Sequence, residues 1–416
     1  MNLLKKILSS SLWLLIGNSI GRLAMFLANI FAARMLSQEA FGQFAMIRST
    51  ISSIEGLISG SLGSTVIKKI AQTNHEEKEN LPYILSTIFI LNVLIAIIIS
   101  IFIFFGADFI VEKFLLNNTK LINALNIGIL ILITTTFANL IQNILIGFEE
   151  FRKLAILSII TSTLSIPTIF ILIYFFQFYG ALFGIIFYFT LDSFIKYFYF
   201  KKLSILTKFE LDKFKNESKN ILIFIFPIFL TFLINGFSFW YARVLVVNGT
   251  NSFEEIAIFD AAFQWLTIIM IITTATTNVV LPKLSKTNSD NKEKRKIFFL
   301  GLIVNFLISF IISITFISFS KEIMSIYGNN YIRGYETLNI LAITSIVFTI
   351  SLYLNRFSIS NNKSWILFVA SFFGSIAMFS LIYFNLDALN IKYLAWSFFT
   401  YYCATIIIYL LKIRKC

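Results

Sequence analysis

Apolar runs of about 20 residues recur along the whole chain and leave no room for a separate soluble domain. A helix rising about 1.5 Å per residue needs a run of that length to cross a hydrocarbon core of roughly 30 Å. The runs show no alternating polarity and exceed the roughly 10 residues of a tilted barrel strand, so helices are expected. Only 13% of the residues are charged, against about 25% in soluble proteins. The sequence therefore predicts an all-α membrane protein.

The runs predict about twelve transmembrane helices. They are expected near residues 10–33, 41–67, 82–106, 121–148, 154–177, 180–200, 221–247, 256–281, 297–319, 335–355, 364–385 and 390–411. The first run follows Lys5 and Lys6 as a signal peptide would, but it contains Arg22 and no evident small-residue cleavage site. We therefore interpret it as a retained span.

Basic residues are distributed unevenly between the two sides that twelve spans define. Of the 34 lysines and arginines, 25 lie with the termini, six lie on the opposite side, and three lie inside spans. Lys196, near the end of the sixth span, is counted among the 25. The positive-inside rule makes that side cytoplasmic, together with both termini. The net charge of +13 thus indicates membrane sidedness, and no nucleic-acid partner is expected.

The chain is expected to consist of two similar halves. A hydrophilic connection near the middle predicts an N-terminal six-helix lobe at 1–200, a cytoplasmic linker at 201–220 and a C-terminal six-helix lobe at 221–416. With six spans each, the lobes would be parallel repeats. An offset of 215 residues supports this, because it aligns Ser37, Glu39, Phe41 and Phe44 with Ser252, Glu254, Ile256 and Phe259.

Few residues are of the types that bind metals or act as nucleophiles. The two cysteines, Cys403 in the last apolar run and Cys416 at the end, predict no disulfide framework and no thiolate metal site. The single histidine, His75, lies in a polar loop and is interpreted as a solvated side chain. Neither metal catalysis nor a Ser/His triad has the residues that it requires. We expect no cofactor, no metal and no enzymatic activity.

The three basic residues inside spans are all arginines: Arg22, Arg48 and Arg243. A charged side chain at mid-bilayer depth costs roughly 2.5 to 3.5 kcal/mol on insertion scales, so it rarely faces lipid. A guanidinium is always charged and can bind a phosphate through two parallel hydrogen bonds. If the lobes face each other, these side chains converge on the external half of a central cavity. The pattern favours binding of an anionic, phosphorylated headgroup.

Three acidic residues inside spans, Glu55, Asp192 and Asp260, leave alternatives open. Glu55 lies at the depth of Arg22 and Asp260 near that of Arg243, so the arginines could simply be paired with acids. Asp192 lies closer to the cytoplasmic end. The acids could instead bind a proton or sodium ion that drives transport, with Asp260 as the best candidate. Arg243 could also snorkel to the membrane interface.

Several local patterns resemble those of a known group of transporters. They are Gly21, Arg22, Ala33, Arg34 and Leu36 followed by Phe41 and Gly42, then the segment 147–155, and the run 257–282 that ends in Leu281 and Pro282. Together they resemble the polysaccharide/O-antigen repeat-unit flippases of the multidrug/oligosaccharidyl-lipid/polysaccharide exporter superfamily. The resemblance implies two pseudo-symmetric six-helix bundles around a central cavity.

The resemblance also implies a role for the arginines. In the lipid II branch of the superfamily, arginines of the first, second and seventh or eighth helices line the cavity and engage a pyrophosphate. Arg22, Arg48 and Arg243 occupy similar places in this chain. The implied protein resides in the cytoplasmic membrane of a bacterium, with lipids and other polysaccharide-assembly membrane proteins as its neighbours.

The leading hypothesis is a flippase that moves an undecaprenyl-pyrophosphate-linked oligosaccharide from the cytoplasmic to the external leaflet by alternating access. A first rival is a cation-coupled exporter of drugs or other small molecules, which would favour an acidic cavity. A second rival is a membrane glycosyltransferase or polysaccharide polymerase. Such enzymes generally need a large external loop or an acidic catalytic pair, and the external gaps of this chain are all short.

Overall fold

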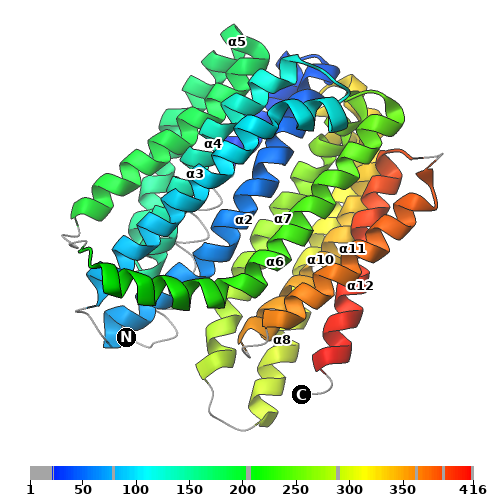
Figure 1. Cartoon of the computed structure of the whole chain (residues 1–416). Helices are drawn as coiled ribbons and strands as arrows, with labels where there is room; N and C mark the ends of the chain where they lie inside the picture. Colours follow the sequence, from blue (N-terminus) through cyan, green and yellow to red (C-terminus); the bar gives the residue numbers. More distant parts are fainter. Residues whose placement is uncertain are drawn as a thin grey trace. The chain divides into compact units, whose positions relative to one another are not determined.

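The computed structural model describes residues 21, 23–76, 80–202, 208–286, 291–360, 364–386 and 389–413, and this described part is helical with no β-strand (Figure 1). An apolar helix at Leu23–Met35 comes first. The remaining elements are α2 (Gln38–Glu76), α3 (Leu81–Phe114), α4 (Lys120–Gly147), α5 (Phe151–Lys202), α6 (Leu211–Thr250), α7 (Glu254–Lys286), α8 (Asn291–Ser318), α9 (Ser320–Ser325), η1 (Asn329–Gly334), α10 (Tyr335–Ser360), α11 (Ser364–Tyr383) and α12 (Ile391–Ile413). The predicted all-α fold class is confirmed.

The helices account for the twelve predicted spans. Nine helices in the described ranges are long and apolar enough to cross a membrane, and Leu23–Met35 is a shorter apolar one. The nine include α5, whose 52 residues contain two predicted spans. The second predicted span corresponds to α2, which is 39 residues long but carries many Ser, Gly and charged residues. Counting α5 twice and adding these two helices gives twelve.

The element α5 is a helical hairpin. Gln177 has a non-helical backbone conformation (φ 46°, ψ −118°), in the left-handed region that non-glycine residues rarely adopt. A Cβ on Gly180 would lie only 2.0 Å from the carbonyl oxygen of Leu172, so this tight reversal requires glycine. Further along both arms, Gly184 lies against Ile169. The two arms, Phe151–Leu172 and Gly180–Lys202, therefore run antiparallel.

The contacts between Cα atoms divide the chain into two compact units. One contains the described part of Ile16–Met35 together with Met46–Phe237, and we call it the N-terminal unit. The other, the C-terminal unit, contains Leu36–Ala45 and the described part of Ser238–Cys416. The segment expected to be a linker, 201–220, is helical from Leu211 onward, because α6 begins there. The lobe boundaries at 200 and 221 stay a prediction.

In the N-terminal unit, α2 and α4 pack side by side in the same direction. Gly128 of α4 lies against Ile51 of α2, and Gly147 lies against Ile70, five turns further along both helices. A Cβ on either glycine would come within 2.7 or 2.8 Å of the isoleucine side chain. Small residues at such contacts let membrane helices approach closely and gain dispersion energy. This packing fixes the positions of the polar side chains on α2.

In the C-terminal unit, buried hydroxyl groups connect neighbouring helices. The Ser313 and Ser345 hydroxyls lie 2.9 Å apart between α8 and α10, and those of Ser351 and Thr405 lie 2.8 Å apart between α10 and α12. Hydrogen bonds of this kind contribute about 0.6 kcal/mol each between membrane helices. They hold α10 in register with its neighbours.

The first turns of α2 belong to the C-terminal unit. The Glu39 carboxylate accepts hydrogen bonds from the Ser252 hydroxyl (3.1 Å) and the Phe253 backbone N–H (3.0 Å). Ser37 accepts a hydrogen bond from the Ala40 N–H at the start of α2, and Ser252 accepts one from the Glu254 N–H at the start of α7. Ser37 and Ser252, which the 215-residue offset aligns, thus each accept a hydrogen bond from a backbone N–H at the start of a helix.

Candidate functional site

Arg48 is held between the first two helices of the N-terminal unit. It lies about ten residues, or three turns, after the start of α2 and is half-buried. Its Nη1 donates a hydrogen bond of 2.5 Å to the Oδ1 of Asn29, on the helix Leu23–Met35. The predicted placement of Arg22 on the first helix lies outside the described residues. The structure thus gives Arg48 a fixed orientation through a neutral amide.

Glu55 lies seven residues beyond Arg48 on α2, close to the same face of the helix. Its Oε1 accepts a 2.7 Å hydrogen bond from the Nδ2 of Asn139 on α4. The predicted pairing with Arg22 is not tested, because Arg22 lies outside the described residues. The structure nevertheless assigns Glu55 a neutral hydrogen-bond donor within its own unit.

Arg243 is enclosed by aromatic rings in the C-terminal unit. Its side chain is on α6 and only 7% exposed. The guanidinium carbon lies 5.0 Å from the ring centre of Phe263 on α7, 5.3 Å from that of Phe259, and 5.5 Å from that of Phe398 on α12. Its Nη1 donates to the Phe239 carbonyl (3.0 Å). Guanidinium–ring contacts of this kind are attractive and stronger when desolvated.

Two observations bear on the predicted role of Arg243: its depth in α6 and the rings that surround it. Arg243 lies seven residues before the end of α6 at Thr250, about two turns, and so deeper in its helix than the single turn that the sequence predicted. A snorkelling side chain would extend its charged end toward water, whereas this guanidinium lies among rings of two neighbouring helices. The geometry resembles a preorganised cation rather than an interfacial anchor.

Asp260 is the buried acid of the C-terminal unit. It lies on α7, is 5% exposed, and accepts a 3.2 Å hydrogen bond from the Nε2 of Gln264. The Oε1 of Gln264 in turn accepts a 3.2 Å hydrogen bond from the Tyr327 hydroxyl. Tyr327 directly precedes η1, so the network connects α7 to the connection between α9 and α10. Asp260 follows Phe259 directly in sequence and therefore lies near the ring cluster around Arg243.

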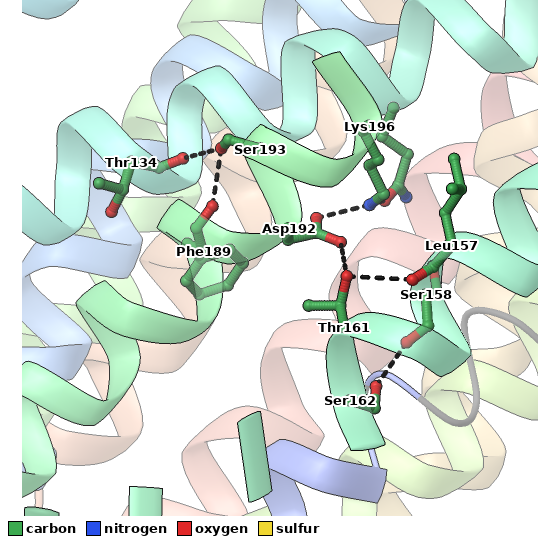
Figure 2. Close-up of polar contacts among 10 residues, drawn as sticks. Thr134, Leu157, Ser158, Thr161, Ser162, Phe189, Asp192, Ser193 and Lys196 are labelled. Carbon is green, nitrogen blue, oxygen red and sulfur yellow. Dashed lines mark hydrogen bonds and ion pairs between the residues drawn. The ribbon is translucent and has the colours of Figure 1, made fainter. Parts of the chain in front are cut away.

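Asp192 forms an ion pair, one of the two roles considered for it, but its partner is a lysine that the sequence analysis did not name. Its Oδ2 lies 2.5 Å from the Nζ of Lys196, one turn further along the second arm of the α5 hairpin (Figure 2). Lys196 is only 2% exposed. The charge count left Lys196 outside the spans, among the residues assigned to the cytoplasmic side, whereas the structure buries it within α5. The inference that only arginines lie buried within spans is wrong for the same reason.

The predicted residues fall into two groups. Arg48, Glu55 and Asp192 belong to the N-terminal unit, while Arg243 and Asp260 belong to the C-terminal unit. The convergence of Arg48 and Arg243 on one cavity stays a prediction. No three His, Cys, Asp or Glu side chains in the described ranges gather as they would around a metal ion.

Comparison with known families decides what kind of protein carries these residues. The family of polysaccharide biosynthesis proteins matches residues 7–288, which is more than half of the chain. The chain belongs to this family. The resemblance to polysaccharide flippases that the sequence suggested is thereby confirmed at the level of the family. No curated protein matches the sequence of this chain.

Solved structures with a similar fold are transporters of the same exporter superfamily. One is a multidrug resistance MATE family transporter in an inward-facing conformation, with a TM-score of 0.79, 15% identity, and coverage of 96% of this chain and 98% of that one. Another, from Pyrococcus furiosus, has a TM-score of 0.74 and 18% identity, with coverage of 99% and 95%. The binding pocket of that Pyrococcus transporter is described as having reverse polarity, which suggests a different function for it.

A eukaryotic MATE transporter is also similar, with a TM-score of 0.75, 12% identity, and coverage of 99% of this chain and 95% of that one. At these identities the likeness shows the fold, which is that of a transporter with two pseudo-symmetric halves. The chain is thus a member of this family, with helices long and apolar enough to span a membrane several times and with the fold of these transporters.

Proposed function

We propose that this transporter is a flippase for an undecaprenyl-pyrophosphate-linked oligosaccharide, in the cytoplasmic membrane of a bacterium. One observation carries the proposal: each unit holds a guanidinium in a fixed orientation on one of its long helices. Arg48 is oriented by Asn29, and Arg243 by three rings and the Phe239 carbonyl. A preorganised fork of donors loses little entropy when it binds a pyrophosphate through paired hydrogen bonds.

The proposed transport cycle follows from this chemistry. Guanidinium donors such as those of Arg48 and Arg243 would bind the pyrophosphate, while the polyprenyl tail stays in the lipid. Replacement of the headgroup's hydration by guanidinium donors lowers the cost of taking the anion across the hydrocarbon layer. Alternating exposure to the two sides would deliver the oligosaccharide to the external leaflet. The membrane lipids and other polysaccharide-assembly proteins would be its partners.

The proposal is tested by complementation of a strain that lacks its own repeat-unit flippase. Arg48→Lys and Arg243→Lys keep the charge but lose the planar fork, so each should reduce surface polysaccharide at least about tenfold, the equivalent of 1.4 kcal/mol. Arg333→Lys is the matched control, because Arg333 is 52% exposed and pairs with Glu254 and Glu255 outside the proposed site. Protein amounts in the membrane are measured for every variant. Wild-type export by both Arg48→Lys and Arg243→Lys would overturn the proposed role.

A second candidate is a cation-coupled exporter of small molecules. It is supported by the fold, since similar structures are described as multidrug MATE transporters, and by the buried acid Asp260. Efflux of a fluorescent organic cation from intact cells distinguishes the two candidates. The exporter predicts energy-dependent efflux that Asp260→Asn abolishes, with polysaccharide unaffected. The flippase predicts no efflux above that of cells without the protein.

A further inference from the structure

The buried pair of Asp192 and Lys196 lies apart from the residues proposed to bind the pyrophosphate. Both side chains belong to the second arm of the α5 hairpin, which is one of the candidate membrane spans, and are 4% and 2% exposed. Removing two ions from water is costly, and their mutual attraction offsets that cost only when further hydrogen bonds satisfy them. The groups around the pair therefore decide what it does.

Oxygen atoms from three helical segments converge on this pair. The Lys196 ammonium donates to the Asp192 Oδ2 (2.5 Å) and to the Oε1 of Gln142 on α4 (2.8 Å). The Asp192 Oδ1 lies 3.3 Å from the Thr161 hydroxyl, which comes from the first arm of the hairpin (Figure 2). A carboxylate and an amide carbonyl thus contact the ammonium, and the Thr161 hydroxyl donates a hydrogen bond to the other oxygen of that carboxylate.

An ion pair between residues four apart on one helix needs no such surroundings. Pairs of this spacing form on exposed helix faces, where they stabilise by a small amount without a third group. Here Gln142 comes from α4, and Thr161 from the opposite arm with 0% of its surface exposed. Carboxylate and carbonyl oxygens are among the ligands that hard metal cations prefer in proteins. The arrangement resembles a metal-cation site in which the ammonium group of Lys196 takes the place of the metal ion.

We propose that the Lys196 ammonium is a tethered cation that fills an oxygen-lined site between α4 and the two arms of α5. The N-terminal unit then requires no external cation at this place. Removal of the ammonium opens the site to a monovalent metal cation, which binds the Asp192 carboxylate and the Gln142 amide carbonyl. Asp192 is consequently not a coupling residue in the native chain, so any coupling acid must lie elsewhere.

Lys196→Ala tests this proposal, because it removes the ammonium and leaves room for an ion. The purified variant and the wild type are melted in detergent at equal ionic strength, with either NaCl or choline chloride. Ligands that bind the folded state raise its melting temperature, so 150 mM Na⁺ should raise that of the variant by about 2 °C or more. The wild type should show no difference between the two salts.

Two further variants control for misfolding of the alanine variant and for sodium binding elsewhere in the protein. Lys196→Gln also removes the charge and should respond to sodium, so it replaces Lys196→Ala if the alanine variant does not fold. Asp192→Asn combined with Lys196→Ala removes the carboxylate, and the sodium response should disappear. Equal melting in both salts for both single variants would overturn the proposal, and so would a sodium response that survives Asp192→Asn. These measurements do not depend on which substrate the transporter carries, so their failure leaves the flippase proposal standing.

Discussion

The close approach of Gly42 to Phe253 makes Gly42→Ala a sharp test of the packing at the start of α2. A Cβ on Gly42 would lie 1.9 Å from the carbonyl oxygen of Phe253 and 2.6 Å from its carbonyl carbon. Ordinary contacts begin at 3.4 Å, so the two backbones would have to separate by about 1.5 Å. Backbone atoms oppose the new methyl group, so no change of rotamer can relieve the overlap.

The expected loss of stability follows from what this separation breaks. Glu39, one turn before Gly42, accepts hydrogen bonds from Ser252 at 3.1 Å and from the Phe253 N–H at 3.0 Å. A shift of about 1.5 Å would take both beyond hydrogen-bonding distance. Overpacking costs about 1–3 kcal/mol, and a lost hydrogen bond to a charged group about 1.5–3 kcal/mol. Partial relaxation of the structure reduces the combined loss, and we expect the free energy of unfolding to fall by about 3 kcal/mol.

The assay is thermal unfolding of the purified protein in detergent, with Gly106→Ala as the matched control. Gly106 lies within α3, and a Cβ there would meet nothing within 4 Å. Alanine is favoured over glycine in helices by up to about 1 kcal/mol, so this control should melt at or above the wild-type temperature. Gly42→Ala should melt several degrees lower. If Gly42→Ala melted with the wild type, the packing of α2 against Phe253 would be refuted.

Three further predictions concern stability and use the same thermal melts. Arg243→Lys loses the planar group between the rings and should destabilise by about 1–2 kcal/mol, whereas the exposed Arg333→Lys should change stability by less than about 0.5 kcal/mol. Equal melting of these two variants would contradict the ring cluster. Glu39→Ala should cost about 2 kcal/mol and Glu39→Gln less, because the amide keeps one acceptor oxygen. Glu336→Gln removes a half-exposed ion pair with Lys392, which water screens, and should leave the melting temperature nearly unchanged. A clear fall in the melting temperature would mean that this pair is shielded from water.

Much of the fold could be predicted because the hydrocarbon layer allows few solutions. An apolar run of sufficient length has to satisfy its backbone internally, so it becomes a helix wherever it occurs. The ends of the helices were less predictable. The span expected at 41–67 continues in α2 to Glu76, and α6 begins at Leu211 within the expected linker. Polar helix ends carry no apolar signal, so sequence alone interprets them as loops.

The charged residues of the candidate site could be predicted from the sequence, whereas the residues that contact them could not. Apolar surroundings in the sequence placed Arg48 and Arg243 within helices, and the structure has them within α2 and α6. The orientation of Arg243 depends on a ring from α12, Phe398, which is far away in the sequence. Lys196 was missed because basic residues near the end of a span are usually solvated. Its spacing of four from Asp192 was the one signal that could have indicated a pair.

The central claim is that this transporter moves a polyprenyl-pyrophosphate-linked oligosaccharide across the membrane. The most direct measurement reconstitutes the purified protein in liposomes that contain such a lipid and follows how much of the oligosaccharide an external lectin can reach. Wild-type protein should make the lipids of the inner leaflet accessible, and the double variant Arg48→Ala/Arg243→Ala should give the same signal as protein-free liposomes. Equal accessibility with wild-type protein and without protein would contradict the flippase, and a double variant as active as the wild type would contradict the role of the two arginines.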